Sequence, residues 1–258
     1  MITLYDNPFS PFTRKVRMVL DHKGLAFTRI DALTLAHADA LRAVNPRREV
    51  PVLVDDGLTV VNSADIVAYL EHRYPQPPVY PADVAVRVAA RAWERLADGV
   101  LDAIIHDISI WAWPTLRRDD VPPPGLIEAG RDDLAAVCGR LEDALTAGPF
   151  VCGALSVADF AVYPHLSALR PLGLGVDPAV HPKLTAWMHR MRGLPVVARD
   201  LAYINDAARA AFVDVPSPYE AHVIVWRGDR IEWLFHHGFT AWWCAEYQAG
   251  RAVVPGAL

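Results

Sequence analysis

The chain has 258 residues, more than one ordinary domain holds and fewer than three domains require. Its 53% hydrophobic and 21% charged residues are typical of a globular protein and exclude a disordered or low-complexity chain. The net charge of −5, with no block of Lys or Arg, disfavours nucleic acid and anionic membranes as partners. No apolar run approaches the roughly 18 residues of a membrane span, and we expect no secretory signal.

The thiols and imidazoles give no sign of a metal site. Cys138, Cys152 and Cys244 form no CxxC pair and leave one cysteine over in any pairing, as in a reduced, cytoplasmic protein. Ten histidines occur without HxxxH or HExxH spacing, so we expect no bound metal.

Residues 1–80 mix strand and helix patterns and predict a small α/β domain. A β-prone run over Ile2–Tyr5, a helical pattern over Thr13–Lys23 and a second β-prone run over Leu25–Ile30 read as the opening of a βαβ unit. The runs Val50–Val54 and Leu58–Val61 flank Asp55-Asp56-Gly57, which predicts a hairpin. A helix is expected from Asn62 to Leu70, followed by a proline-rich linker.

Residues 83–213 are helical in pattern and predict an all-α domain. The expected helices cover Val84–Trp111, Ile127–Leu145, Lys183–Arg192 and Val196–Phe212. Ser156 and Asp159 have the spacing of a capping box at the start of a further helix. Residues 214–258 form an extension, for which we expect a β-α-α-β order. Eight of its 44 residues from 215 onward are aromatic, against 9% for the whole chain.

The segment Ser10-Pro11-Phe12 places a hydroxyl at the start of the first helix. Ser10 suits the N-cap and Pro11 the first helical position, where free amides and the macrodipole favour a thiolate. Lowering a thiol pKa from about 8.5 to about 6.5 takes roughly 2.7 kcal/mol. A hydroxyl hydrogen bond to a charged acceptor contributes about 1.5–3 kcal/mol and the dipole about 0.3–2 kcal/mol, which together suffice. The local sequence alone favours a Ser10 that only caps the helix, since capping serines are common.

Two further features favour a binding site. Val50-Pro51 enters a β-rich run, where proline is unfavourable unless it begins the strand or follows a cis bond. A cis Pro51 would leave the backbone of Val50 able to pair with an extended peptide. Asn62-Ser63 opens the next helix and offers amides and a hydroxyl to a carboxylate. Each feature alone is compatible with a structural role; together with Ser10 they predict a site for a small anionic peptide with a thiol.

These segments, in this order and spacing, resemble the cytosolic glutathione transferase superfamily over residues 1–212. The resemblance rests on Ser10–Arg17, Asn45-Pro46, Val50–Leu53, Asn62–Leu70, Ser156–Asp159 and His181–Leu184. It implies an α/β thioredoxin-like N-terminal domain (1–80), an all-α C-terminal domain (83–213) and usually a homodimer, here with the extension 214–258 added.

The resemblance also implies roles for individual residues. As in serine-type members, Ser10 would hydrogen-bond the glutathione sulfur and Val50, before a cis Pro51, would pair with the cysteinyl backbone. Ser63, with Asn62, would hold the γ-glutamyl end. Tyr5 is an alternative hydroxyl donor, but it lies within a strand and too early for the helix start.

The chain departs from the family at two of these positions. Asn62 replaces a Glu or Gln and is shorter. Glu49 replaces a common Lys and would face the glycyl carboxylate with like charge. At a solvated site that repulsion is on the order of 1 kcal/mol, about fivefold in affinity, and Arg47 or Arg48 could offset it.

A second substrate would lie between the two domains. Phe9 and Phe12 on one side and His106, Ile110, Trp111 and Trp113 on the other are candidate walls, although buried aromatic residues usually only pack. The aromatic residues of the extension are expected to cover either this cleft or a subunit contact.

Two functions remain open. The first is a glutathione transferase that conjugates glutathione to a small, largely apolar electrophile, with Ser10 stabilising the thiolate; a serine cannot form the mixed disulfide of a reductase. The second is a non-catalytic, transferase-like binding or adaptor protein, which the residues Asn62 and Glu49 favour.

Overall fold

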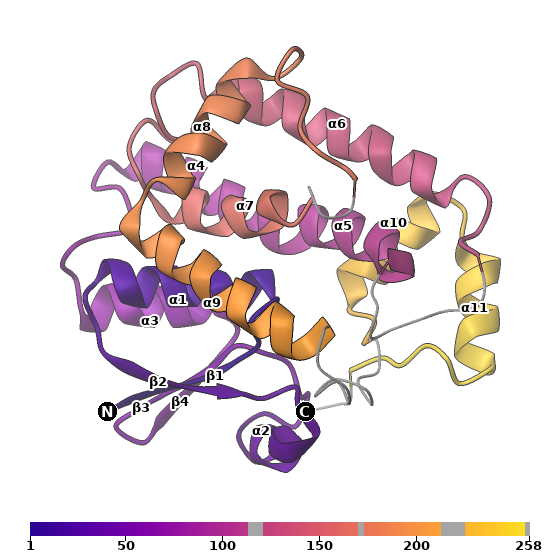
Figure 1. The fold of residues 1–258 in the computed structure, drawn as a ribbon, viewed down its shortest axis with the longest axis horizontal. Helices are drawn as coiled ribbons and strands as arrows, with labels where there is room; N and C mark the ends of the chain where they lie inside the picture. Colours follow the sequence, from indigo (N-terminus) through magenta and orange to yellow (C-terminus); the bar gives the residue numbers. More distant parts are fainter. Residues whose placement is uncertain (113–120, 170–172, 213–224, 256–258) are drawn as a thin grey trace.

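The computed structural model describes residues 1–112, 121–169, 173–212 and 225–255. A four-stranded sheet of order β2-β1-β3-β4 occupies one end of the molecule (Figure 1). β1 and β2 are parallel and are joined by α1, whereas β3 and β4 form an antiparallel hairpin with β3 beside β1. The elements are β1 (Ile2–Asp6), α1 (Pro11–His22), β2 (Phe27–Asp31), β3 (Val52–Asp55) and β4 (Leu58–Val61). The predicted βαβ opening and hairpin are therefore confirmed.

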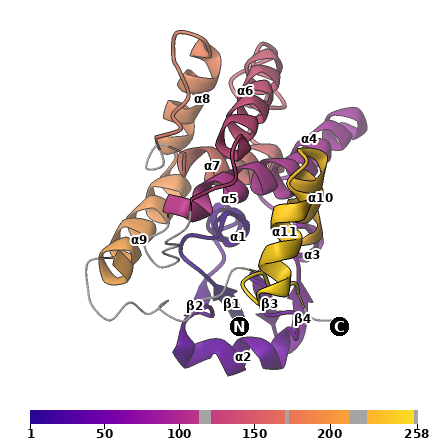
Figure 2. The same cartoon turned by 90° about the vertical axis from the view of Figure 1, so that its right-hand side faces the viewer.

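Helices cover both faces of this sheet (Figures 1 and 2). α1 and α3 (Ser63–Arg73) lie on one face, and α2 (Ala38–Val44), preceded by the 3-10 turn η1 (Leu35–His37), lies on the other. The sequence analysis missed α2. Leu41 is its buried residue and packs with Ala32 and Val52, so the helix has no apolar stripe for a periodicity argument to detect.

The second half of the chain is helical, as expected. The predicted helix over 84–111 is continuous, but it contains a π-helical turn that a 3.6-residue period does not anticipate. Its parts are α4 (Val84–Leu96), the π turn η2 (Ala97–Leu101), α5 (Asp102–Ser109) and the 3-10 turn η3 (Ile110–Ala112). It is followed by α6 (Leu126–Ala144), α7 (Val157–Ser167), α8 (Pro182–Arg192) and α9 (Pro195–Phe212). The predicted bounds of α6, α8 and α9 agree within one residue.

The predicted capping box at the start of α7 is present. The carboxylate of Asp159 accepts hydrogen bonds from the backbone amide of Ser156 at 2.9 Å and from the indole of Trp187 at 2.8 Å. Burial raises the pKa of Asp159, and these donors oppose that rise. The cap thus also fixes α8 against α7.

The extension contributes α10 (Gly228–His236) and α11 (Thr240–Gln248), which break at Gly238, where φ is 82°. α10 packs on η2 and α5 (Figures 1 and 2). In place of the two predicted flanking strands, the described residues of the extension form one parallel bridge between Val225 and Val253. Most of the predicted strand over 222–226 lies outside the described residues.

α1 joins the sheet to the helical part of the chain through buried charges. Its apolar residues, such as Val16, belong to the core, while Arg14, Lys15 and Arg17 are also buried. Arg14 and Arg17 both bind the carboxylate of Asp200 in α9, at 2.9 and 2.7 Å.

Arg17 also fixes the loop between β1 and α1. Its guanidinium pairs with Asp6 at the end of β1 and donates to the carbonyls of Asn7, at 3.2 Å, and Pro8, at 3.0 Å. The loop that leads to Ser10 is therefore tied to α9 through one side chain.

Asp200→Asn is expected to lower the free energy of unfolding by about 3–5 kcal/mol, because it leaves two buried guanidinium groups undercompensated. Urea denaturation measures the change. The matched control is Asp21→Asn, whose partner Arg199 has a side chain that is 56% exposed, and which is expected to cost less than about 1 kcal/mol. Equal losses in the two variants would contradict the role given to the buried network.

Candidate functional site

Ser10 lies at the N-cap of α1, as predicted, and its hydroxyl proton is uncommitted. The Oγ atom accepts from the amide of Thr13 at 3.5 Å, which is a weak contact, and no acceptor for its proton lies among the described residues. The side-chain oxygen of Asn7 accepts from the amides of Phe9 and Ser10, both at 3.1 Å. The backbone around Ser10 is thus fixed independently of its hydroxyl, which is able to donate to an anion.

The peptide bond between Val50 and Pro51 is cis, and both residues precede β3. Neither backbone group of Val50 pairs with another described residue, so both can bind an extended ligand. The side chain of Asn45 donates to the carbonyl of Glu49 at 2.9 Å and holds the turn before Val50.

The N-terminus of α3 combines Asn62 and Ser63. Asn62 is the N-cap, with φ of 72°, a left-handed conformation that Asn tolerates better than most residues. Its side chain already accepts from the amide of Ala64 at 2.9 Å. Ser63 is buried and its hydroxyl lies 3.5 Å from the carboxylate of Asp98, so the first turn of α3 faces η2.

Glu49 forms an ion pair with Arg47, whose Nε atom donates to the carboxylate at 2.9 Å. The hydrogen bond raises the pKa of Arg47. Both side chains are about one-third exposed. The negative charge expected to repel a glycyl carboxylate is thus largely balanced within the loop.

Glu49→Gln is expected to raise glutathione affinity by at most about fivefold, because it removes a negative charge that the glycyl carboxylate would approach. Calorimetric titration at low ionic strength measures the dissociation constant. Glu128→Gln, an exposed glutamate in the first turn of α6, is the control for net charge. Unchanged or weaker binding in Glu49→Gln would exclude Glu49 from the neighbourhood of the ligand carboxylate.

The predicted walls of the second-substrate site lie under the extension. Phe12 is 9% exposed, and its ring faces the guanidinium of Arg227. The Cζ atom of Arg227 lies 4.6 Å from the centroid of that ring. His106 meets the ring of Trp226 edge-on at 5.4 Å, and Trp111 lies 5.8 Å from Trp242.

The other three candidate wall residues differ in their exposure. Phe9 is half-buried and Ile110 is fully buried, whereas Trp113 lies outside the described residues. Phe12, His106 and Trp111 each contact a side chain of the extension. This packing favours the prediction that the extension covers the cleft.

Buried carboxyl groups of α5 differ in their environments. Burial alone would raise the pKa of Asp102, but Arg230, which donates to it at 3.0 Å, acts together with His165 and Arg227 to outweigh burial, and the pKa is lowered. Burial raises the pKa of Asp107 well above its ordinary range, and one of its oxygens has no partner among the described residues. The ring of His106 contacts the other oxygen at 2.8 Å.

The raised pKa of Asp107 and the lowered pKa of Asp102 predict opposite effects on stability when each residue is replaced by Asn. Because the folded state raises the pKa of Asp107, stability is lost as pH rises from the unfolded value, near 3.8, towards the folded value. Asp107→Asn should therefore be more stable than the parent at pH 8, with a smaller gain at pH 4. Asp102→Asn should be less stable at pH 8, because the lowered pKa of Asp102 stabilises the fold above pH 3.8. Urea denaturation at the two pH values tests both, and destabilisation by Asp107→Asn at pH 8 would contradict the assignment.

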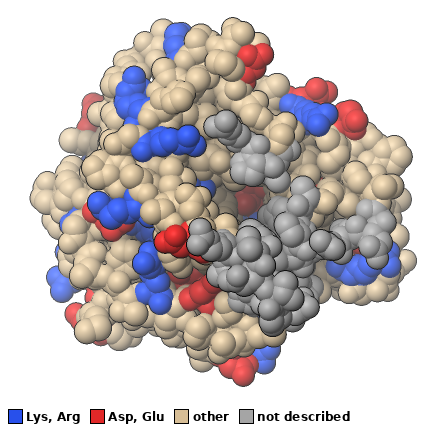
Figure 3. All heavy atoms as spheres, viewed as in Figure 1, with Lys and Arg blue, Asp and Glu red and all other residues tan. Residues whose placement is uncertain are grey.

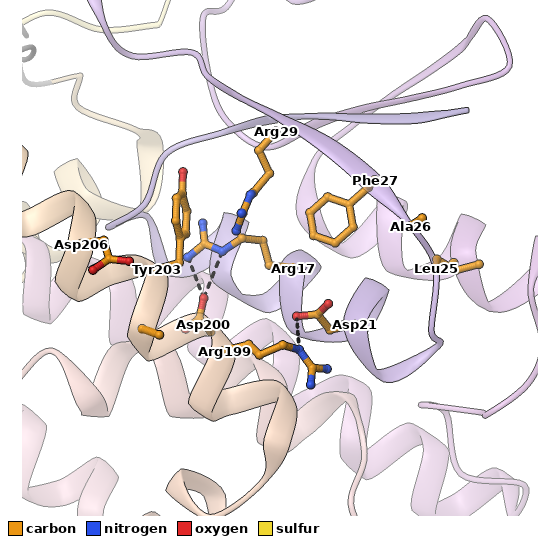
Figure 4. Close-up of a pocket in the computed structure, with 11 residues that line it drawn as sticks. Arg17, Asp21, Leu25, Ala26, Phe27, Arg29, Arg199, Asp200, Tyr203 and Asp206 are labelled. Carbon is orange, nitrogen blue, oxygen red and sulfur yellow. Dashed lines mark hydrogen bonds and ion pairs between the residues drawn. The ribbon is translucent and has the colours of Figure 1, made fainter.

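A groove of about 520 Å³ opens on a different flank, between α1, β2 and α9 (Figure 4). Arg29 and Arg17 lie 4.0 and 4.9 Å from the ring centroid of Tyr203, and Arg199 pairs with Asp21. Burial raises the pKa of Tyr203 to about 12, so its phenol stays neutral near pH 7. None of the predicted site residues lines this groove, whose acidic and basic side chains balance one another.

The surface and the described side chains give little support to other kinds of site. In the view of Figure 3, basic and acidic groups are interspersed around a central hollow. Within the described part of the chain, no three His, Cys, Asp or Glu side chains are grouped to hold a metal ion. No helix in that part combines the length and apolar content needed to cross a membrane.

Three residues near the site escaped the sequence analysis: Lys15, Asp98 and Arg227. Lys15 is buried and binds Asp98 and Glu94, and Asp98 contacts Ser63. The Nη2 atom of Arg227 donates to the carbonyl of Asp98 at 3.3 Å. Direct partners in this chain of contacts lie up to 129 positions apart, and no local motif signals them.

Comparison with known proteins places this geometry in context. Residues 4–78 match the family model described as glutathione S-transferase, N-terminal domain, and residues 124–190 match the corresponding C-terminal domain model. Mouse glutathione S-transferase theta-1 is 31% identical over 180 residues, covering 64% of this chain and 69% of that protein.

Two further relatives differ in what their names describe. FtsZ-localized protein A of Caulobacter vibrioides is 27% identical over 178 residues, covering 66% of this chain and 78% of that protein. A glutathione S-transferase from Methylobacillus flagellatus, crystallised with GSH bound, superposes with a TM-score of 0.68 at 27% identity, covering 78% of this chain and 98% of that chain.

Proposed function

Because the chain belongs to the glutathione S-transferase family and has its fold, a small mixed sheet followed by a helical part, we propose that it conjugates glutathione to a small electrophile. The observation that carries this proposal is the hydroxyl of Ser10, which caps α1 and has no described acceptor for its proton. A thiolate at that point gains a charge-assisted hydrogen bond and the field of the helix N-terminus.

The remaining residues orient the peptide. Val50 offers its unpaired backbone to the cysteinyl unit, and the first turn of α3 at Asn62 and Ser63 offers its amides to the γ-glutamyl carboxylate. The sulfur attacks the electrophilic atom, a carbon–sulfur bond forms, and the leaving group departs with its electron pair. At an activated double bond, the carbon that gains the pair is protonated from water instead. We further place Phe12, His106 and Trp111 around the electrophile.

Ser10→Ala is expected to lower turnover of glutathione with 1-chloro-2,4-dinitrobenzene by tenfold or more, because it removes a charge-assisted hydrogen bond worth about 1.5–3 kcal/mol. The release of the thioether is followed by absorbance. Tyr5→Phe removes the alternative hydroxyl and is expected to retain activity. Full activity in Ser10→Ala, with loss in Tyr5→Phe, would transfer the role to Tyr5.

A non-catalytic adaptor is the second candidate, favoured by the similarity to FtsZ-localized protein A and by the departures at Asn62 and Glu49. The two candidates differ in their affinity for glutathione. Calorimetric titration with reduced glutathione separates them, because absent binding together with absent turnover favours the adaptor.

We also propose a homodimer in the cytoplasm, with a role in detoxification. Val84 and Val88, one turn apart on α4, are 71% and 65% exposed and offer an apolar face for a second subunit. The three cysteines are free thiols, as in a reducing compartment. Sedimentation analysis of the full chain tests the dimer.

A further inference from the structure

The extension brings a cation to the proposed site. Arg227, at the start of α10, covers Phe12, which lies two residues after Ser10. Its Nη2 atom also donates to the carbonyl of Asp98, whose side chain contacts Ser63. Arg227 therefore contacts Phe12, in the first turn of α1, and is linked through Asp98 to Ser63, in the first turn of α3.

Part of this guanidinium is available to a ligand. Nη2 donates to the carbonyl of Asp98 and to the carboxylate of Asp229, at 3.3 and 2.8 Å. Nε and Nη1 have no partner among the described residues, and the side chain is 27% exposed. Nε and Nη1 lie on different edges of the guanidinium, and an N–H of either nitrogen can donate a charge-assisted hydrogen bond to a carboxylate oxygen.

Among the described side chains near Phe12, the other cationic groups are committed elsewhere or neutral, and Arg227 is the cation that a ligand can reach. Lys15 is buried on Glu94 and Asp98, and Arg230 is committed to Asp102. Burial lowers the pKa of His165, which meets Phe12 edge-on, so this imidazole is neutral near pH 7. Asp229 balances part of the charge of Arg227, but it occupies only one nitrogen.

We propose that Arg227 forms an anion subsite that selects electrophiles carrying a carboxylate group. This inference rests on the proposed function and narrows it. The extension places a cation over Phe12, so an acceptor bearing a carboxylate binds better than its neutral analogue. The glutathione thiolate itself remains with Ser10.

The test compares two electrophiles with the same reactive ring, 4-chloro-3,5-dinitrobenzoate and 4-chloro-3,5-dinitrobenzamide. Arg227→Gln, which keeps N–H donors without the charge, is expected to lower kcat/KM for the benzoate by tenfold or more and for the amide by less than twofold. Arg227→Lys should restore part of the preference. Arg42→Met, on α2 across the sheet, removes the same charge from an exposed site and should leave both values unchanged.

A second measurement needs no turnover. The S-aryl glutathione conjugates of the two probes are titrated into parent and Arg227→Gln protein by calorimetry. If Arg227→Gln weakens binding of the carboxylate conjugate alone, the anion subsite is supported. This holds even if the protein turns over neither probe, a result that would contradict only the proposed catalysis. Equal affinities of the two variants for the carboxylate conjugate, equal weakening of both conjugates, or binding of neither conjugate to the parent protein would overturn the subsite.

Discussion

The position of the site depends on the buried guanidinium of Arg17. One side chain forms ion pairs with Asp6 and Asp200 and donates to the carbonyls of Asn7 and Pro8. A buried charge is costly unless it is paired and hydrogen-bonded, so α9 and the sheet have to meet in one arrangement to satisfy it. The same arrangement presents Ser10 at the start of α1. The geometry of a surface hydroxyl is thus set by an ion pair between residues 183 positions apart.

Lys15 makes a second connection, two residues before Arg17 in the same helix. It pairs with Glu94 and Asp98 in the long helical stretch, and Asp98 in turn contacts Ser63 and Arg227. Through Asp98, α1 is thereby connected by polar contacts to the N-terminus of α3 and to the extension. Since side chains in such a network act together, substitutions at Asp98 or Lys15 are expected to be non-additive with those at Arg227.

Local signals in the sequence predicted what local chemistry determines. The hairpin at Asp55-Asp56-Gly57 and the capping box at Ser156 depend on residues a few positions apart, and each is found. α2 was missed because it buries one residue. The ion pairs of Arg17 and the contact of Arg227 with Phe12 were missed for another reason: a periodic pattern treats charged residues as solvent-exposed, and pairing across the fold leaves no trace in spacing.

The two departures from the family pattern change less than the sequence suggests. Arg47 balances the charge of Glu49 within the same loop, and the side chain of Asn62 is already committed to capping α3 through the amide of Ala64. Neither alters the hydroxyl of Ser10 or the unpaired backbone of Val50. The charge introduced by the extension, in contrast, lies over Phe12, where an electrophile would approach a sulfur held by Ser10. Under the proposed function, we therefore expect Arg227 to have more effect on the choice of electrophile than Asn62 and Glu49 have on the binding of the tripeptide.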